Sequence, residues 1–204
     1  MTVEAVIHVV DDDESLRTAL QRQLAAAGHH VRTYASAGEF LLAPPPDGPG
    51  CLLLDLSMPG PSGLELQDAL GRHGVRLPVI FLTGHGDLAA GVRAMKAGAV
   101  DFLTKPVERE TLLDAIGRAL KTDAARRASR NSDAQLRARF AQLTPREREV
   151  FELVVAGLLN KQIADRLGIG ERTVKAQRAQ VMAKLDAANA AELGRIAAAL
   201  HGAF

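Results

Sequence analysis

The chain has 204 residues, 47% of them hydrophobic and 24% charged, which is ordinary for a globular protein of one large or two modest domains, and its single cysteine excludes an internal disulfide framework. No apolar run approaches the roughly 20 residues of a membrane span, and no signal peptide is recognisable at the N-terminus, so we expect a cytoplasmic protein without a membrane partner. The net charge of +1 is unevenly distributed: residues 1–121 hold 15 acidic and 11 basic side chains (net −4), whereas residues 122–204 hold 9 and 14 (net +5), which favours a polyanionic partner for the C-terminal part.

Short apolar strands alternate with helical patterns over residues 1–121, which we expect to form one domain. The expected strands are Val6–Val10, Val31–Tyr34, Cys51–Leu54, Leu77–Thr83 and Val100–Leu103. The expected helices are Leu16–Leu24, Ala37–Leu42, Leu64–Leu70, Leu88–Ala97 and Leu112–Leu120. Apolar strands separated by helices are typical of an α/β fold whose parallel sheet is covered on both faces. Cys51, inside an apolar strand, is expected to be a small core residue.

The sequence changes character after residue 121. Six alanines and five arginines occupy residues 122–141 without a strand pattern, so we expect a linker over 122–138 that is partly helical. From Leu143 onward every pattern is helical, and residues 139–204 are expected to form a second, all-α domain. Thr144, Pro145 and Glu147 form the N-cap, first and third positions of a capping box. Three further helices are expected at Asn160–Leu167, Glu171–Leu185 and Ala190–Leu200.

Polar residues follow the expected strands where each strand ends. Asp11 and Asp12 follow the first strand, Asp55 the third and Lys105 the fifth, while Thr83 ends the fourth. The carboxyl ends of parallel strands meet at one edge of the sheet, where ligands bind in such folds. Converging carboxylates repel one another unless a cation joins them, and their oxygens suit Mg²⁺. A metal beside a carboxylate, an ammonium and a hydroxyl predicts phosphoryl transfer onto that carboxylate.

Each of these residues also has an ordinary structural explanation when taken alone. Asp11 and Asp12 could cap a helix, with Asp13 and Glu14 at its positive end. The residues by themselves allow either a hydrolase that passes through an aspartyl-phosphate or a protein that keeps this group as a signal. A hydrolase would use a second acid near Asp55, but two uncharged residues follow it. No glycine-rich nucleotide loop is present, so the phosphoryl donor is expected to be another molecule.

Four segments resemble the receiver domain of response regulators, and the resemblance extends over about residues 5–121. They are Val9–Asp13, Leu54–Gly60, Phe81–Asp87 and Ala97–Pro106. The run Gly84–Asp87 is similar to the FixJ-type branch. The resemblance implies a flavodoxin-like fold with a five-stranded parallel sheet. It also implies Asp55 as phosphoacceptor and Mg²⁺ as cofactor, held by Asp12, Asp55 and the backbone carbonyl of Ser57, with Asp11 binding mainly through water.

The same resemblance assigns three residues to the response that follows phosphorylation. Lys105 would pair with the phosphoryl group and Thr83 would hydrogen-bond it. Phe102 occupies the aromatic switch position and would turn inward as Thr83 moves. A sensor histidine kinase is the implied donor. Slow self-dephosphorylation would then be signal decay, so we expect a phosphoacceptor protein that is not an enzyme.

The C-terminal helices have the helix–turn–helix pattern. Val174, Val181 and Leu185 fall on one line of the third helix and predict its buried face. The opposite side is basic at its start and small along its length, and carries Arg172, Lys175, Ala176, Ala179, Gln180 and Ala183. Because a helix enters the major groove only where its backbone can come close, this face suits DNA, although a solvated helix in an ordinary bundle would look similar.

A second resemblance, over about residues 139–201, is to the LuxR-type DNA-binding domain. It is carried by Leu143–Val150, Gly157, Asn160–Ala164 and Arg172–Lys175. It implies that Lys161 and Thr173 face phosphates and that Lys175 and Ala176 face bases. Gln177 stands where relatives usually have histidine and Gly170 where many have a serine cap. Few side chains on this face can hydrogen-bond bases, so we expect specificity to depend on DNA shape and dimer spacing.

Together the two resemblances indicate a response regulator of the NarL/FixJ architecture. The implied partners are a sensor kinase, double-stranded promoter DNA and, as a further candidate, RNA polymerase, with activation the commoner outcome in this branch. One helix–turn–helix contacts one half-site, so we expect a homodimer on phosphorylation. Before phosphorylation the receiver would either hold the chain monomeric or mask the third helix. The alternative is a DNA-binding scaffold that works without phosphate.

Overall fold

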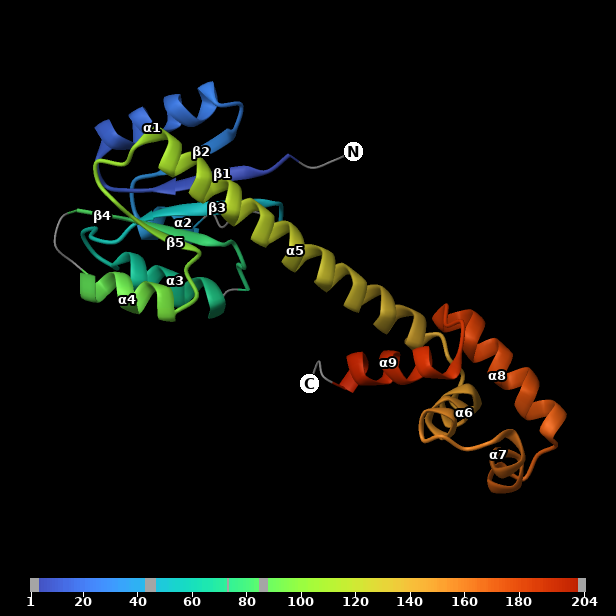
Figure 1. The fold of residues 1–204 in the computed structure, drawn as a ribbon. Coiled ribbons are helices and arrows are strands. Elements are labelled where there is room, and N and C mark those ends of the chain that lie inside the picture. The colour runs from blue at the N-terminus through green and yellow to red at the C-terminus, as the bar shows by residue number, and fades with distance from the viewer. Residues whose placement is uncertain (1–3, 43–46, 73, 85–87, 202–204) are drawn as a thin grey trace. The chain divides into compact units, whose positions relative to one another are not determined.

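The computed structural model describes residues 4–42, 47–72, 74–84 and 88–201, so His85, Gly86 and Asp87 of the FixJ-like segment lie outside it. The chain divides into two compact units, Met1–Arg126 and Arg127–Phe204. The first contains β1 (Val6–Val10), α1 (Glu14–Ala26), β2 (His30–Tyr34), α2 (Ala37–Leu42), β3 (Gly50–Asp55), α3 (Gly63–Arg72), β4 (Val79–Thr83), α4 (Leu88–Lys96) and β5 (Asp101–Thr104). The remaining elements are α5 (Arg109–Ala141), α6 (Pro145–Val155), α7 (Asn160–Leu167), α8 (Glu171–Leu185) and α9 (Ala190–His201) (Figure 1).

The first unit is a five-stranded parallel sheet with strand order β2-β1-β3-β4-β5 (Figure 1). This confirms the predicted flavodoxin-like α/β fold. Four of the five expected strands have different starts: β2 and β3 each begin one residue earlier, β5 begins one residue later, at Asp101, and β4 begins two residues later, at Val79 after Pro78. Proline lacks the amide hydrogen that a central strand needs for its ladder, which explains the later start of β4.

Each face of the sheet carries its own apolar layer. On one face, alternate residues of β1, β3 and β4 pack with Leu20 and Leu24 of α1 and with Leu112 and Ile116 of α5. On the other face, the remaining strand residues pack with α2, α3 and α4. All six residues of β3 are buried, including Cys51, whose thiol has a pKa that burial raises to about 12. Cys51 is therefore the small, unreactive core residue expected from the sequence.

The segment expected to be a linker is helical throughout. Helix α5 contains 33 residues and passes through the boundary between the two units. Alanine and arginine are among the best helix formers, and this segment contains no proline that would end the helix. Asp123 lies on this helix, wholly buried, and its Oδ2 accepts a hydrogen bond of 3.1 Å from the backbone N–H of Gly50 at the start of β3.

The second unit has one apolar core shared by α6 to α9 and the end of α5. Its capping box is present: the Thr144 hydroxyl accepts from the Glu147 N–H, and the Glu147 carboxylate accepts from the Thr144 N–H. Leu193 and Ala197 of α9 belong to the core, so this helix packs against the other helices of the unit. Among the described residues, no helix combines the length and apolar character needed to cross a bilayer.

Candidate functional site

The polar residues predicted at the strand ends lie together at the carboxyl edge of the sheet. Asp55 is the last residue of β3, and Asp11 follows β1 immediately; these strands are neighbours, with Val10 paired to Leu54. Asp11, Asp12 and Asp55 each offer a carboxylate oxygen, and these oxygens lie within 4.8 Å of one another. Residues separated by more than forty positions therefore form one acidic group, because parallel strands of similar length end at the same edge.

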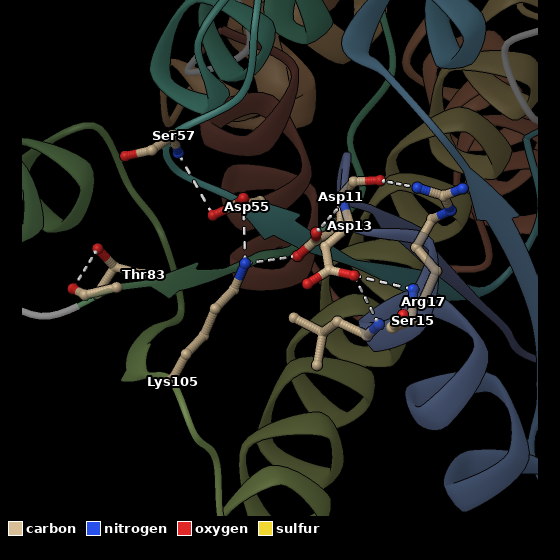
Figure 2. Close-up of polar contacts among 10 residues, drawn as sticks. Asp11, Asp13, Ser15, Arg17, Asp55, Ser57, Thr83 and Lys105 are labelled. Atoms are coloured by element: carbon tan, nitrogen blue, oxygen red, sulfur yellow. Dashed lines mark hydrogen bonds and ion pairs between the residues drawn. The ribbon is translucent and has the colours of Figure 1, made fainter.

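Lys105 joins two of these acids. Its ammonium lies 2.6 Å from Asp11 Oδ2 and 3.1 Å from Asp55 Oδ2, as Figure 2 shows. Burial raises the pKa of Asp55 above its ordinary value, and the neighbouring ammonium only partly opposes this effect. Burial alone would lower the pKa of Lys105, but hydrogen bonds to Asp11 and Asp55 raise it. The site thus holds a charged lysine between two carboxylates, one of which, that of Asp55, is predicted to accept phosphorus.

The acidic group suits a hard divalent cation. Asp11 is completely buried and Asp55 is 5% exposed, whereas Asp12 is exposed to solvent. Two carboxylates held this close in low-dielectric surroundings need positive charge, and one ammonium supplies only one unit of it. The N–H of Ser57 donates to Asp55 Oδ1 at 3.3 Å, so the loop after β3 also borders the site. The residues present therefore fit Mg²⁺, which binds oxygen ligands and retains water.

Thr83 and Phe102 lie on the strands next to this group. Thr83 is 2% exposed, and its hydroxyl donates to the Gly84 carbonyl at 3.1 Å; among the described residues it makes no hydrogen bond to Asp55 (Figure 2). The Phe102 ring is half-buried and packs on Gly91 of α4, where an added methyl group would come within 2.8 Å of the ring. The two residues assigned to switching are therefore close to the site and to α4.

Two residues that the sequence argument did not assign to the site lie in the β1–α1 loop and the first turns of α1. Asp13 is the N-cap, and its carboxylate accepts from the N–H groups of Ser15 and Leu16. The capping that the sequence left open for Asp11 or Asp12 is therefore performed by Asp13. Arg17 donates from Nη1 to the backbone carbonyl of Asp11 at 2.7 Å. The spacing of four residues between the N-cap Asp13 and Arg17 could have predicted this contact, because it places the Arg17 side chain near the start of the helix.

Gly63 allows α3 to begin directly against Asp55, and we expect Gly63→Ala to disturb the site. A methyl group there would come within 2.4 Å of the Asp55 carbonyl oxygen, a backbone atom that cannot rotate away. We expect a loss of about 2 kcal/mol or more in the free energy of unfolding, together with slower phosphorylation. Gly71→Ala is the matched control, because Gly71 lies on the same helix with open space around it, and there alanine should stabilise by about 0.5–1 kcal/mol. Urea unfolding of both variants measures the contrast, and equal stability would contradict the proposed close contact.

The second unit presents the helix–turn–helix pair α7 and α8. Gly168 ends α7 in the left-handed conformation, with φ of 64°. Val174, Val181 and Leu185 of α8 are buried, which confirms the predicted inner face. The residues expected to face DNA are all exposed: Lys161, Arg172, Thr173, Lys175, Ala176, Ala179 and Gln180. The surface is therefore available, although its contacts with DNA remain a prediction.

Several polar residues of this unit bond within it. Arg178 of α8 donates to the side-chain oxygen of Asn160 at 3.1 Å, and Arg146 donates to the Leu167 carbonyl at 2.8 Å. These contacts hold the ends of α7 against α6 and α8. Gln177 is half-buried, and none of the described residues hydrogen-bonds its buried Oε1. Gln177 therefore lies beside the buried inner face of α8, next to Val174 and Val181.

Glu147 and Lys184 form an ion pair of 2.6 Å between α6 and α8, and we expect Glu147→Gln to weaken this unit in a pH-dependent way. Hydrogen bonds from Lys184 and from the Thr144 backbone lower the pKa of Glu147. A carboxyl whose pKa is lower in the folded state contributes stability above its unfolded pKa, near 4.5, and loses this contribution as the pH falls through the folded value. We expect wild type to be about 1 kcal/mol more stable than the variant at pH 7, with the gap closing below pH ~4. Urea unfolding across pH tests this, and a gap that persists in acid would contradict it.

The chain matches two protein families and several proteins of known sequence. Residues 7–117 match the family described as response regulator receiver domain, and residues 141–197 match bacterial regulatory proteins, luxR family. The transcriptional regulatory protein FixJ of Rhizobium meliloti is 45% identical over 97% of this chain and 96% of its own length. Nodulation protein W of Bradyrhizobium diazoefficiens is 44% identical over 98% of this chain and 88% of its own. The chain is a response regulator of the NarL/FixJ family.

Solved structures of response regulators are also similar to this chain. The response regulator StyR is 46% identical, covers 96% of this chain and 98% of its own, and has a TM-score of 0.86. Full-length FixJ from B. japonicum is 39% identical over 98% of this chain and 99% of its own, with a TM-score of 0.61. This response regulator is therefore a two-component transcriptional regulator, in which a receiver domain controls a LuxR-type DNA-binding domain by phosphorylation. It is not a typical enzyme.

Proposed function

We propose that this response regulator accepts its phosphoryl group on Asp55 from the histidine of a sensor kinase, dimerises, and binds promoter DNA. The observation that carries the proposal is the ammonium of Lys105 bridging Asp11 and Asp55 at the carboxyl edge of the sheet. Structural aspartates at strand ends do not require a cation between them, whereas a phosphoryl acceptor needs positive charge where the phosphoryl oxygens arrive.

The chemistry follows from the contacts of Asp55. One carboxylate oxygen attacks the phosphorus, a new O–P bond forms, and the P–N bond to the donor imidazole breaks as its electron pair returns to the ring nitrogen. Lys105 lies beside Oδ2 and would pair with a phosphoryl oxygen, while the Ser57 N–H orients Oδ1. Asp12, Asp55 and the Ser57 carbonyl would hold Mg²⁺, with Asp11 acting mainly through water. When bound, the ion would supply positive charge that offsets the negative charge of the carboxylates as the phosphoryl group arrives. Slow hydrolysis of the acyl phosphate would end the signal.

The signal would leave the site through Thr83 and Phe102. The Thr83 hydroxyl would exchange its bond to the Gly84 carbonyl for one to a phosphoryl oxygen, and Phe102 would turn inward from its place on Gly91. Val92 and Met95 of α4 are 49% and 47% exposed and border an apolar hollow beside Phe102. We expect this face to change shape and to pair two receivers, because exposed apolar groups gain most from being covered.

Paired receivers would bring two copies of α8 to the two halves of an operator. Lys161 and Thr173 would contact phosphates, and Lys175 and Ala176 would face bases, supported by Arg172, Ala179 and Gln180. Specificity would then depend largely on DNA shape and half-site spacing. We propose residues 1–121 as the receiver and 139–204 as the DNA-binding domain, joined through α5. We also propose that the DNA-bound dimer contacts RNA polymerase and activates the promoter.

Beryllofluoride, which mimics an aspartyl-phosphate, tests the switch. With Mg²⁺ present we expect the chain to become dimeric in analytical ultracentrifugation and to bind a duplex selected from random sequence at least about tenfold more tightly. Met95→Glu should keep the protein monomeric, since it places a charge in the apolar α4 face. Leu42→Glu is the control, because Leu42 is 89% exposed on α2. Unchanged mass and unchanged DNA affinity would favour the constitutive scaffold.

A further inference from the structure

Within the described part of the chain, the one side-chain hydrogen bond of Arg17 is to the backbone of the loop that carries Asp11, Asp12 and Asp13. The half-buried Arg17 donates from Nη1 to the carbonyl oxygen of Asp11 at 2.7 Å (Figure 2). The Asp11 carboxylate is already engaged at both oxygens, with Oδ1 accepting from the Asp13 N–H at 2.9 Å and Oδ2 paired with Lys105. The guanidinium therefore binds the one acceptor of Asp11 that belongs to the main chain.

That carbonyl belongs to the peptide plane that connects Asp11 to Asp12. A peptide unit is planar, so fixing the direction of its carbonyl also places the Cα of the next residue and the N–Cα bond about which that residue's side chain turns, which narrows the positions that the side chain can reach. Asp12 is exposed, and within the described residues no hydrogen bond or ion pair holds its carboxylate. The direction of Asp12 thus depends on the backbone before it.

We propose that Arg17 is a positioning residue for the divalent-cation site: it holds the Asp11–Asp12 peptide so that the Asp12 carboxylate faces Asp55. This inference rests on the proposed function, because it assumes that these acids bind the cation. An arginine is suited to the task, since its guanidinium stays charged and its planar donors hold a fixed direction, whereas a lysine ammonium rotates and hydrates strongly. Groups that orient ligands in this way commonly affect metal affinity by tenfold or more when removed.

The positioning role can be distinguished from a simple charge effect, because the two predict opposite changes in Mg²⁺ affinity when Arg17 is removed. A cation beside a cation site repels the incoming ion, so removal of Arg17 for its charge alone would tighten Mg²⁺ binding. Removal of a group that orients Asp12 would weaken it. The direction of the change in Mg²⁺ affinity therefore decides between the two roles.

The experiment titrates Mg²⁺ into the full unphosphorylated chain and follows the backbone amide of Asp12 by NMR. We expect Arg17→Met, which keeps the apolar stem of the side chain, to weaken Mg²⁺ binding about tenfold and to shift the Asp12 amide signal before any ion is added. Arg17→Lys should recover only part of the affinity. Arg22→Ala removes an exposed arginine from the same helix and should leave affinity unchanged. Methylguanidine added to Arg17→Ala should restore affinity, which a merely structural role would not allow.

The outcomes also separate this inference from the function on which it rests. If wild type binds no Mg²⁺, or if its binding is insensitive to Asp55→Ala, the proposed cation site is wrong. If wild type binds Mg²⁺ but a folded Arg17→Met binds it equally or more tightly, the cation site stands and the positioning role is overturned. At saturating Mg²⁺ we expect phosphorylation by acetyl phosphate to return close to the wild-type rate, since the defect lies in affinity.

Discussion

Asp55→Asn should abolish stable phosphorylation. The amide carries no negative charge, so it cannot attack phosphorus as the carboxylate does, and it cannot share a divalent cation in the same way. The asparagine side chain is almost the same size as the aspartate side chain that it replaces. We therefore expect β3, which is buried along its whole length and ends at residue 55, to remain intact. After incubation with acetyl phosphate and Mg²⁺, intact-mass spectrometry should find one added phosphoryl group on wild type and none on the variant.

Asp68→Asn is the matched control for this substitution. Asp68 is an exposed carboxylate on α3, and its loss should leave phosphoryl uptake at the wild-type level. A phosphoryl group that survived in Asp55→Asn would mean that another residue is the acceptor. Rapid loss of the group from wild type, with turnover of acetyl phosphate, would instead favour the hydrolase that the residues alone allow.

The double variant Arg172→Ala/Lys175→Ala should lose most of its DNA affinity. Both side chains are exposed at the start of α8, and the three buried residues of this helix lie on its other side. Each cation that leaves a phosphate or base contact costs roughly 1–3 kcal/mol, so the double variant should bind at least about tenfold more weakly, with a shallower dependence on salt. Fluorescence anisotropy with the selected duplex at several salt concentrations measures both quantities.

Arg195→Ala provides the comparison. Arg195 lies on α9 with 76% of its side chain exposed, so the variant loses one positive charge from the same unit without changing α8. We expect its affinity and salt slope to match wild type. Equal losses in the two variants would mean that binding follows net charge, and that α8 is not the helix that enters the groove.

Local patterns were sufficient for the fold and for the central pocket. Strand ends can be read from apolar runs, and parallel strands bring their ends to one edge, so Asp11, Asp55, Thr83 and Lys105 could be predicted to lie near one another. The buried face of α8 followed from helical periodicity in the same way. The double pairing of Lys105 was less accessible, because no sequence pattern specifies which oxygens an ammonium will reach.

The contacts that were missed connect residues without a shared periodicity. Arg17 binds a main-chain carbonyl, an acceptor that every residue carries and that no motif marks. Asp123 reaches Gly50 across 73 positions, and it lies in a segment whose composition indicated a connector. The continuous α5 was underestimated for a related reason: serine and asparagine at 129–132 are typical of loops, but the alanine and arginine around them favour a helix more strongly.

The buried bond between Asp123 and Gly50 restricts where the two halves of the molecule can hinge. Separating α5 from the sheet at this point would break this buried hydrogen bond, at a net cost of about 0.5–1.5 kcal/mol. The same hydrogen bond joins α5 to the first residue of β3, and Asp55 is the last residue of this strand. Any pivot of the DNA-binding half should therefore lie downstream of Asp123, so that the helix up to this residue moves as part of the receiver.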